Sequence, residues 1–248
     1  HEIFIKEDSV SAIADKIATF KFVVRTVAQR HGLHASFMPK PIGGVNGSGM
    51  SLHQTLWQEG HNAFSDPCGQ WGLSGTALHY IGGVLRHIRA ITALANPLVN
   101  SYKRLLPDGL SPVLAGWSEQ NRGTVLRVPA QRGEGTSIVL RSPDPTCNPY
   151  LLLAAILQAG LQGLEEKIEP APPRTESPDP AEMKKTAQKE GLPRSLGQAL
   201  ESLAGDAVVR KALGEHIYSR FLERKELEWE RFQAEVHQWE LDEYLTNF

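Results

Sequence analysis

The sequence is poor in cysteine, in long apolar runs and in excess charge of either sign. Its two cysteines, Cys68 and Cys147, show no paired spacing, which argues against a disulfide-stapled secreted domain and favours a reduced, cytoplasmic setting. No apolar run approaches the roughly 18–20 residues of a membrane-spanning helix, and no signal-peptide pattern is present, so we expect no membrane partner. A formal net charge of −2 over 248 residues gives no reason to expect nucleic acid as a partner.

The hydrophobic residues, 41% of the chain, recur with two different periods. Strands are predicted by alternation or short apolar runs at residues 1–6, 35–39, 50–57, 115–118, 124–128 and 137–141. Helices are predicted by helical spacing at residues 9–31, 76–95, 149–164 and 215–242. Residues 165–191 are polar and contain five prolines, so they are predicted to be a linker or surface loop. We therefore expect a core of residues 1–164, this Pro-rich segment, and a helical segment of the same domain over residues 192–248.

The stretch from Phe37 to His53, FMPKPIGGVNGSGMSLH, stands out because four glycines fall between residues 43 and 49. Glycine accepts positive φ without steric cost, so this run predicts a tight loop whose backbone N–H groups could approach an anionic ligand. A plain surface turn is the alternative for a glycine cluster alone. Residues 44–51 nearly match the phosphate-binding P-loop, but Met50 stands where that motif has its lysine, which excludes it.

This stretch is the first of four blocks that resemble the type I glutamine synthetase family, in the same order as in that family. The other blocks are NSYKRLLP at 100–107, NRGTVLRVP at 121–129 and RSPDPTCNPYLLLAAILQAGLQG at 141–163. The resemblance implies an α+β fold in which a curved antiparallel sheet carries packed helices and a helical C-terminal tail. It also implies that the chain is the catalytic-domain portion without the N-terminal β-grasp domain, and that it forms an oligomer.

In the family, the substrate glutamate is held by the glycine loop and by arginines. The resemblance carries this substrate-binding role to Asn46, Gly47, Arg104, Arg122 and Arg141. Guanidinium suits a carboxylate because its planar fork donates two parallel hydrogen bonds. For Arg104 taken alone, a surface ion pair is the alternative.

The resemblance likewise assigns nucleotide binding to His53, Thr55, Arg122 and Arg127. Arginines near a developing negative charge are what phosphoryl transfer requires, so ATP is a candidate ligand. A strand histidine with no role in binding is the alternative for His53.

The family's metal-binding and general-base positions are mostly replaced. Glu2 matches a family metal ligand, with a surface glutamate at a strand end as the alternative. Ser51 and Val139 stand where the family has a metal-binding histidine and glutamate, and neither is a comparable ligand. Three further metal-binding glutamates of the family belong to strands upstream of the matching region. The flap glutamate that acts as general base is Leu110 here, which cannot accept a proton, so no catalytic residue is assigned. These replacements argue against bound Mg or Mn.

Two functions of different classes follow. The first is a glutamine synthetase-like protein without synthetase activity of its own, a regulatory or structural subunit that binds a glutamate-like small molecule or nucleotide and docks on a full-length glutamine synthetase. The second is an ATP-dependent glutamate–ammonia (γ-glutamyl–amine) ligase, seen as a fragment or completed by another chain. A third, a degraded paralogue without any ligand, is disfavoured by the retained arginines and glycine loop.

Overall fold

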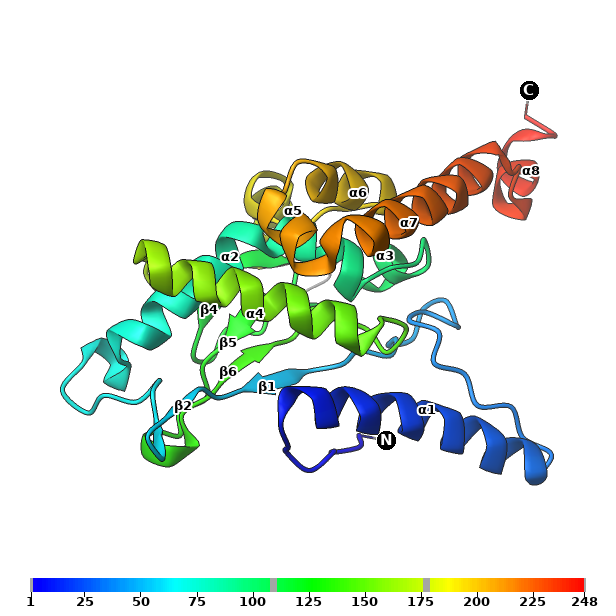
Figure 1. The fold of residues 1–248 in the computed structure, drawn as a ribbon. Helices are drawn as coiled ribbons and strands as arrows, with labels where there is room; N and C mark the ends of the chain where they lie inside the picture. The colour runs from blue at the N-terminus through cyan, green and yellow to red at the C-terminus, as the bar shows by residue number, and fades with distance from the viewer. Residues whose placement is uncertain (1, 108–110, 176–178, 248) are drawn as a thin grey trace.

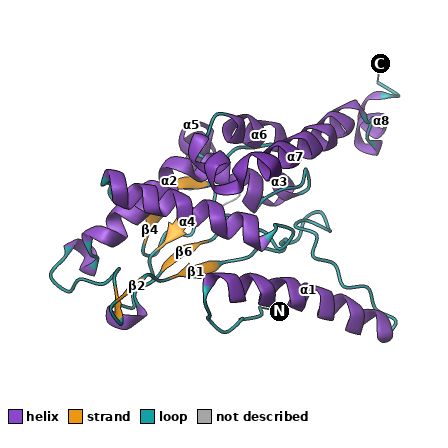
Figure 2. Cartoon of the chain, viewed as in Figure 1, coloured by secondary structure: helices purple, strands orange, loops and turns teal. Residues whose placement is uncertain are grey.

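The computed structural model describes residues 2–107, 111–175 and 179–247 (Figure 1). Its helices, 3-10 turns (η) and strands follow in the order α1 (Val10–Arg30), β1 (Leu52–Gln54), β2 (Trp57–Gln58), β3 (His61–Asn62), η1 (Gln70–Gly72), α2 (Gly75–Ala95), α3 (Ser101–Arg104), β4 (Leu114–Ser118), β5 (Thr124–Arg127), η2 (Gly133–Gly135), β6 (Ile138–Leu140), α4 (Pro149–Glu166), α5 (Pro180–Glu190), α6 (Leu196–Ala204), α7 (Ala207–Ala234) and α8 (Gln238–Tyr244). Figure 2 shows β1, β4, β5 and β6 together in the middle of the molecule, with β2 apart from them at the lower left. None of the helices within these ranges is long and apolar enough to cross a membrane.

The main sheet has four strands in the order β1-β6-β5-β4. The pairs β1–β6 and β6–β5 are antiparallel, as predicted, whereas β4 joins β5 in parallel. A hydrogen-bonded turn precedes β5. Asn121 Oδ1 accepts the Gly123 N–H at 2.8 Å, and Gly123 O in turn accepts the Leu114 N–H at 2.9 Å, so the chain returns to the beginning of β4. Strands β2 and β3 form a separate antiparallel pair.

One face of the sheet forms the core. Leu52, Leu140, Leu126 and Trp117 lie in register across the four strands and are all buried. Helices α2 and α4 pack against each other beside this sheet (Figure 1). Their close approach depends on glycine, because a Cβ atom at Gly83 would overlap the backbone of α4 and one at Gly163 would overlap the backbone of α2.

The two core helices begin where their capping residues predict. Ser74 Oγ accepts the Ala77 N–H at 3.1 Å at the start of α2. Asn148 Oδ1 accepts the Tyr150 N–H at 3.0 Å, and Pro149 occupies the first helical position, where a missing N–H is harmless. The predictions of helices at 76–95 and 149–164 are therefore confirmed.

Three predictions of local structure are wrong. Residues 2–6 and 35–39 are not strands, because alternation makes a strand only where a neighbouring strand completes the hydrogen-bond ladder. Residues 180–190, inside the predicted linker or surface loop, form helix α5. This helix is held by Met183, whose side chain is 2% exposed and packs against Gly123 next to β5.

The helical tail also differs from the prediction of one helix over 215–242. Helix α7 begins earlier, is interrupted at Gly214 with φ of 70°, and ends at Ala234 before α8 begins. Trp229 of α7 is packed, since it lies against Gly197 of α6. Trp239 of α8 is 63% exposed.

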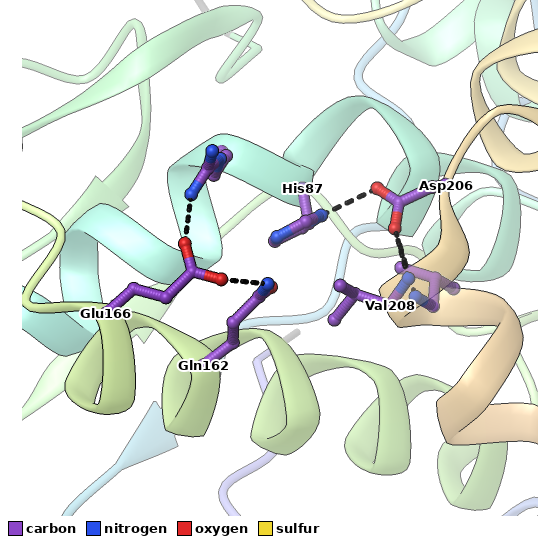
Figure 3. A network of polar contacts seen from close by, with 7 residues as sticks. His87, Gln162, Glu166, Asp206 and Val208 are labelled. Atoms are coloured by element: carbon purple, nitrogen blue, oxygen red, sulfur yellow. Dashed lines mark hydrogen bonds and ion pairs between the residues drawn. The ribbon is translucent and has the colours of Figure 1, made fainter.

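A buried polar contact anchors this tail to the core (Figure 3). His87 of α2 lies 2.7 Å from the Asp206 carboxylate, measured from Nδ1 to Oδ2. Asp206 is also the N-cap of α7, and its Oδ1 accepts the N–H groups of Val208 and Val209 at 3.0 Å. One carboxylate therefore fixes both the start of α7 and its position on α2.

Candidate functional site

The sheet face opposite the core carries a row of predicted site residues. His53 of β1 pairs with Val139 of β6, and Val139 pairs with Arg127 of β5. Residues in register across neighbouring strands point to the same face. His53 and Arg127 are exposed, and Val139 between them is buried, with 4% exposure. The structure therefore brings the predicted nucleotide residues His53 and Arg127 to one surface, either side of an apolar residue.

Arg122 and Arg141 extend this row into a cationic cluster. The Arg141 guanidinium reaches back across β5 and donates from Nη1 to the Arg122 carbonyl oxygen at 2.5 Å. Burial lowers the pKa of Arg141, and the charges of Arg127 and Arg122 lower it further, so each of these two arginines lies within electrostatic reach of Arg141. Burial and then the Arg127 charge also lower the pKa of His53. Within the described ranges, no ion pair with a carboxylate neutralises Arg122, Arg127 or Arg141. We call these three arginines with His53 the cationic face.

The glycine loop is a tight structure tied to α3. Gly47 passes so close to Pro39 that a Cβ atom there would overlap the Pro39 carbonyl oxygen, and Ser48 N–H donates to that same oxygen at 2.8 Å. Asn100 fixes the loop entrance, since its Oδ1 accepts the Lys40 N–H at 2.8 Å and its Nδ2 donates to Lys40 O at 3.0 Å. The plain surface turn is therefore a poor description of this loop. Asn46 is exposed at its tip.

Arg104 lies beneath the loop and is 8% exposed. Its Nη2 donates to Asn96 Oδ1 at 3.0 Å, to Pro143 O at 3.2 Å and to Ser142 O. Its Nη1 faces the loop, because a Cβ atom at Gly49 would be 3.0 Å away from it. Burial lowers the pKa of Arg104, and the nearby Asp144 opposes that shift. Arg104 is thus a buried support of the loop, with one nitrogen turned toward it, and it makes no ion pair with any carboxylate in the described part of the chain.

The remaining predicted site residues lie apart from these two groups. Thr55 follows β1, and its Oγ1 accepts the Trp57 indole N–H at 3.1 Å. Glu2 is exposed in the irregular segment before α1. Leu110, at the flap position, lies outside the described residues.

The residues that are present do not fit a divalent metal. Val139, 4% exposed, has no donor atom, and Ser51, exposed directly before β1, offers only a neutral hydroxyl. Across the ranges that the structure describes, no group of three His, Cys, Asp or Glu residues is arranged to hold a metal ion. The guanidinium groups of the cationic face, by contrast, are donors of the kind that suit anionic oxygen atoms.

Sequence reasoning missed the residues that support the loop. Asn100 and Asp144 were not assigned, although both fall within the blocks NSYKRLLP and RSPDPTCNPY. Asp144 is fully buried, and its Oδ1 accepts the Thr146 N–H at 2.9 Å while its Oδ2 has no hydrogen-bond partner. An acidic residue inside a Pro-rich turn is the only sequence signal for this role.

The fold and the site define an α+β domain that has a cationic sheet face and a glycine loop supported by a buried arginine. Comparison with known proteins identifies the family of this domain. A family model described as "Glutamine synthetase, catalytic domain" matches residues 1–244, so the chain belongs to this family and the resemblance seen in the sequence is confirmed.

Relatives and solved structures agree with this assignment. The chain is 50% identical over 251 aligned positions to a glutamine synthetase of Thermus thermophilus, covering 100% of this chain and 56% of the relative. It is 48% identical to a glutamine synthetase of Methanosarcina mazei, covering 99% of this chain and 56% of that relative. A solved structure titled "GmaS/ADP complex-Conformation 1" superposes with a TM-score of 0.86 at 36% identity, covering 96% of this chain and 55% of that one. The chain thus spans about half the length of the curated relatives it matches, and the predicted α+β fold of this family is confirmed.

Proposed function

We propose that this chain binds phosphate-bearing nucleotide on the cationic face and a glutamate-like carboxylate at the glycine loop, without synthetase activity of its own. The observation that carries the proposal is the cross-strand row of His53, Val139 and Arg127, joined by Arg122 and Arg141. Guanidinium groups without a carboxylate partner are strong donors for phosphate oxygens.

The loop side supports a carboxylate ligand in a different way. Backbone N–H groups of a glycine loop can approach an anion closely because no side chain intervenes. Arg104 Nη1 lies directly below Gly49, so a carboxylate above the loop gains the field of a buried cation. We propose Asn46 and Gly47 as the residues that contact this ligand.

The proposed lack of synthetase activity rests on the replaced positions. Glutamate activation by ATP places strong negative charge on the transferring phosphoryl group, which metal ions neutralise when they are bound. Ser51 and Val139 provide no comparable ligand, and Leu110 cannot act as a base. Losing even one charge-stabilising group typically reduces the rate by about 10²- to 10³-fold. A regulatory or structural role beside a full-length glutamine synthetase follows as part of the same proposal.

Exposed apolar side chains support association with such a partner. Phe22 of α1 is 71% exposed and Trp239 of α8 is 63% exposed, and aromatic side chains are enriched at protein–protein interfaces. The partner is proposed to be a glutamine synthetase chain, and the expected product is a hetero-oligomer detectable by size-exclusion chromatography of the mixture.

A second candidate is an ATP-dependent γ-glutamyl–amine ligase completed by another chain. Two observations favour it: the 50% identity to a protein named glutamine synthetase and the close superposition on a structure titled as an ADP complex. It differs from the first candidate in requiring turnover once the missing groups are supplied.

Binding and turnover measured on the same purified chain test both candidates. Calorimetry with ATP and with glutamate should show binding of each, and Arg127→Gln should weaken ATP binding about tenfold or more, the value of one charge-assisted hydrogen bond. Arg220→Gln on α7 is the matched control, because it removes the same charge from an exposed helix outside the cationic face.

Phosphate release in the presence of ATP, glutamate and an amine decides between the candidates. No release from the chain alone or mixed with a full-length synthetase variant lacking its own activity supports the first candidate. Release that depends on glutamate establishes the second. Failure to bind either ATP or glutamate contradicts both.

A further inference from the structure

We propose that the cationic face prefers phosphate anions in their metal-free form, so that Mg²⁺ weakens nucleotide binding instead of enabling it. The inference rests on the proposed nucleotide-binding function and concerns the ionic form of the ligand. It follows from three features of the sheet face: three guanidinium groups, an apolar residue between them and His53, and acidic residues that are engaged elsewhere.

The positive charge of this face has no local compensation. Arg122, Arg127 and Arg141 make no ion pair in the part of the chain that the structure describes. Like charges in such proximity raise the free energy of the unliganded state, and an anion that binds among them relieves that repulsion. Burial lowers the pKa values of Arg141 and His53, and repulsion from the neighbouring arginine charges lowers them further.

The acidic residue whose backbone contacts Arg127 is engaged with another cation. Glu119 lies in the turn between β4 and β5, and its carboxylate pairs with Arg132. Arg127 contacts Glu119 only through the backbone, donating from Nε to the carbonyl oxygen at 3.2 Å. Arg132 is held in addition by its donation to Trp71 O at 2.8 Å, so this carboxylate is not available to bind a metal on the cationic face.

A divalent cation would meet unfavourable surroundings here. Mg²⁺ binds through oxygen ligands, and in nucleotide sites these are carboxylates of the protein together with phosphate oxygens. At the centre of the row Val139 presents methyl groups, flanked by His53 and Arg127. A magnesium ion carried in by a nucleotide would therefore add two positive charges beside guanidinium groups that, among the described residues, form no ion pair with a carboxylate.

The charge of the ligand then decides the affinity. The magnesium complex of ATP carries two fewer negative charges than free ATP. Removing two charges from a ligand on a solvent-accessible cationic face should weaken binding by about three- to tenfold. The recognised chemistry is a chain of phosphate groups, which both ATP and inorganic tripolyphosphate provide.

The experiment is a pair of calorimetric titrations of the purified full chain at matched ionic strength. ATP is titrated once in EDTA and once with saturating MgCl₂, and tripolyphosphate is titrated in EDTA. We expect ATP to bind about three- to tenfold more tightly in EDTA. If tripolyphosphate binds as tightly as ATP, the phosphate groups account for the affinity. If it binds much more weakly, the nucleoside also contacts the same metal-free site.

Two outcomes overturn the inference, and they are distinguishable. Binding that requires or is strengthened by Mg²⁺ contradicts it while leaving nucleotide binding intact. An absence of ATP binding under both conditions contradicts it together with the proposed function.

A carboxylate introduced on the cationic face should remove or reverse the weakening of ATP binding by Mg²⁺. Val139→Glu is expected to weaken ATP binding in EDTA and to abolish or invert the magnesium penalty, whereas Val139→Gln, of the same size but uncharged, should keep the penalty. Because Val139 is buried, Ser51→Asp provides a second test at an exposed position of the same face. If Val139→Glu and Ser51→Asp both fold correctly and Mg²⁺ still weakens their ATP binding as much as in the native chain, the charge argument is refuted.

Discussion

Arg104 beneath the glycine loop and Arg127 on the sheet face differ in what surrounds their guanidinium groups. Arg104 is 8% exposed and donates to Asn96 and to two backbone carbonyl oxygens. Arg127 is exposed, and its Nε donates to the Glu119 carbonyl oxygen at 3.2 Å. Burying a cation is unfavourable unless its donors are satisfied, so the contacts of Arg104 are part of the fold. The donors of Arg127 face water and remain available to a ligand.

The comparison separates two roles that the sequence resemblance treats alike. Both residues match arginines that contact ligands in the family, yet burial makes one of them a support and exposure leaves the other a binding group. Mutations of the two should therefore change different quantities: the free energy of unfolding for Arg104 and ligand affinity for Arg127.

The largest expected effect is on stability at Arg104. Arg104→Met keeps most of the volume but removes the Arg104 donor of Asn96 Oδ1 and of the Ser142 carbonyl oxygen, whereas the Pro143 carbonyl oxygen keeps the Met50 N–H at 2.9 Å. Buried acceptors that lose a partner typically destabilise by about 1–3 kcal/mol each, so we expect a loss of about 2–4 kcal/mol in the free energy of unfolding. Urea denaturation measures it. Arg127→Met, the control, should change it by less than about 0.5 kcal/mol, and equal losses at both sites would break the comparison.

The burial of Arg104 could not be predicted from its sequence neighbourhood. The segment NSYKRLL contains adjacent cations and reads as surface, whereas the partners of Arg104 come from residues 96 and 142–143, far away along the chain. The core helices were predictable because their caps and apolar spacing are local. Strand pairing was not: alternation at residues 2–6 finds no partner, and β4 joins β5 in parallel through a turn that only the structure reveals.

In the site, too, the features set by local sequence could be predicted, and those set by contacts between distant segments could not. The row of His53, Val139 and Arg127 could be anticipated as three separate residues, since each lies in a predicted strand. Their adjacency depends on the register between β1, β6 and β5, which is not encoded in any one segment. The second half of the Pro-rich segment was misassigned because its proline content obscured Met183 and Ala187, which are four residues apart on the buried side of α5.

Salt should distinguish the two arginine environments without any change at the site. Exposed charges are screened over a Debye length of about 10 Å at 0.1 M salt and about 3 Å at 1 M, whereas buried contacts are screened much less. We expect ATP affinity to fall about tenfold between 0.05 M and 0.5 M KCl. The difference in unfolding free energy between the native chain and Arg104→Met should change by less than about 0.5 kcal/mol. Salt-independent ATP binding would show that the exposed arginines do not carry the affinity.

Asp206, which lies outside both the glycine loop and the cationic face, provides a test of a polar side chain with a purely structural role. Burial raises the pKa of Asp206, but hydrogen bonds from His87 and from the N–H groups of Val209 and Val208 outweigh it and hold the pKa below its ordinary value of 3.8 (Figure 3). A depressed folded-state pKa contributes stability that is present above the unfolded value and is lost as pH falls through the folded value. The free energy of unfolding should therefore decrease as pH drops below about 4.

Asp206→Asn keeps an N-cap acceptor and removes the charge, so it should lower stability at pH 7 by about 1 kcal/mol and flatten the acid dependence. Asp179→Asn is the matched control, because Asp179 caps α5 through Ala181 and Glu182 without a histidine partner. Urea denaturation between pH 3 and pH 7 gives both quantities. ATP affinity should stay unchanged, and a loss of affinity in Asp206→Asn would contradict the separation of structural from binding groups.

The smallest expected effect lies where the two roles meet, at Gly49. An alanine Cβ there would be 3.0 Å from Arg104 Nη1, so either the guanidinium or the loop must shift by a few tenths of an ångström. We expect a loss of about 0.5–1 kcal/mol in stability and about threefold weaker glutamate binding, both measured on Gly49→Ala. Gly43→Ala is the control in the same loop, because its Cβ would meet no atom within 4 Å and its φ lies outside the left-handed region. That change should be neutral or slightly stabilising, since it only restricts the unfolded chain. If both variants behave alike, contact with Arg104 does not set the shape of the loop, and the buried arginine supports the fold without influencing the ligand.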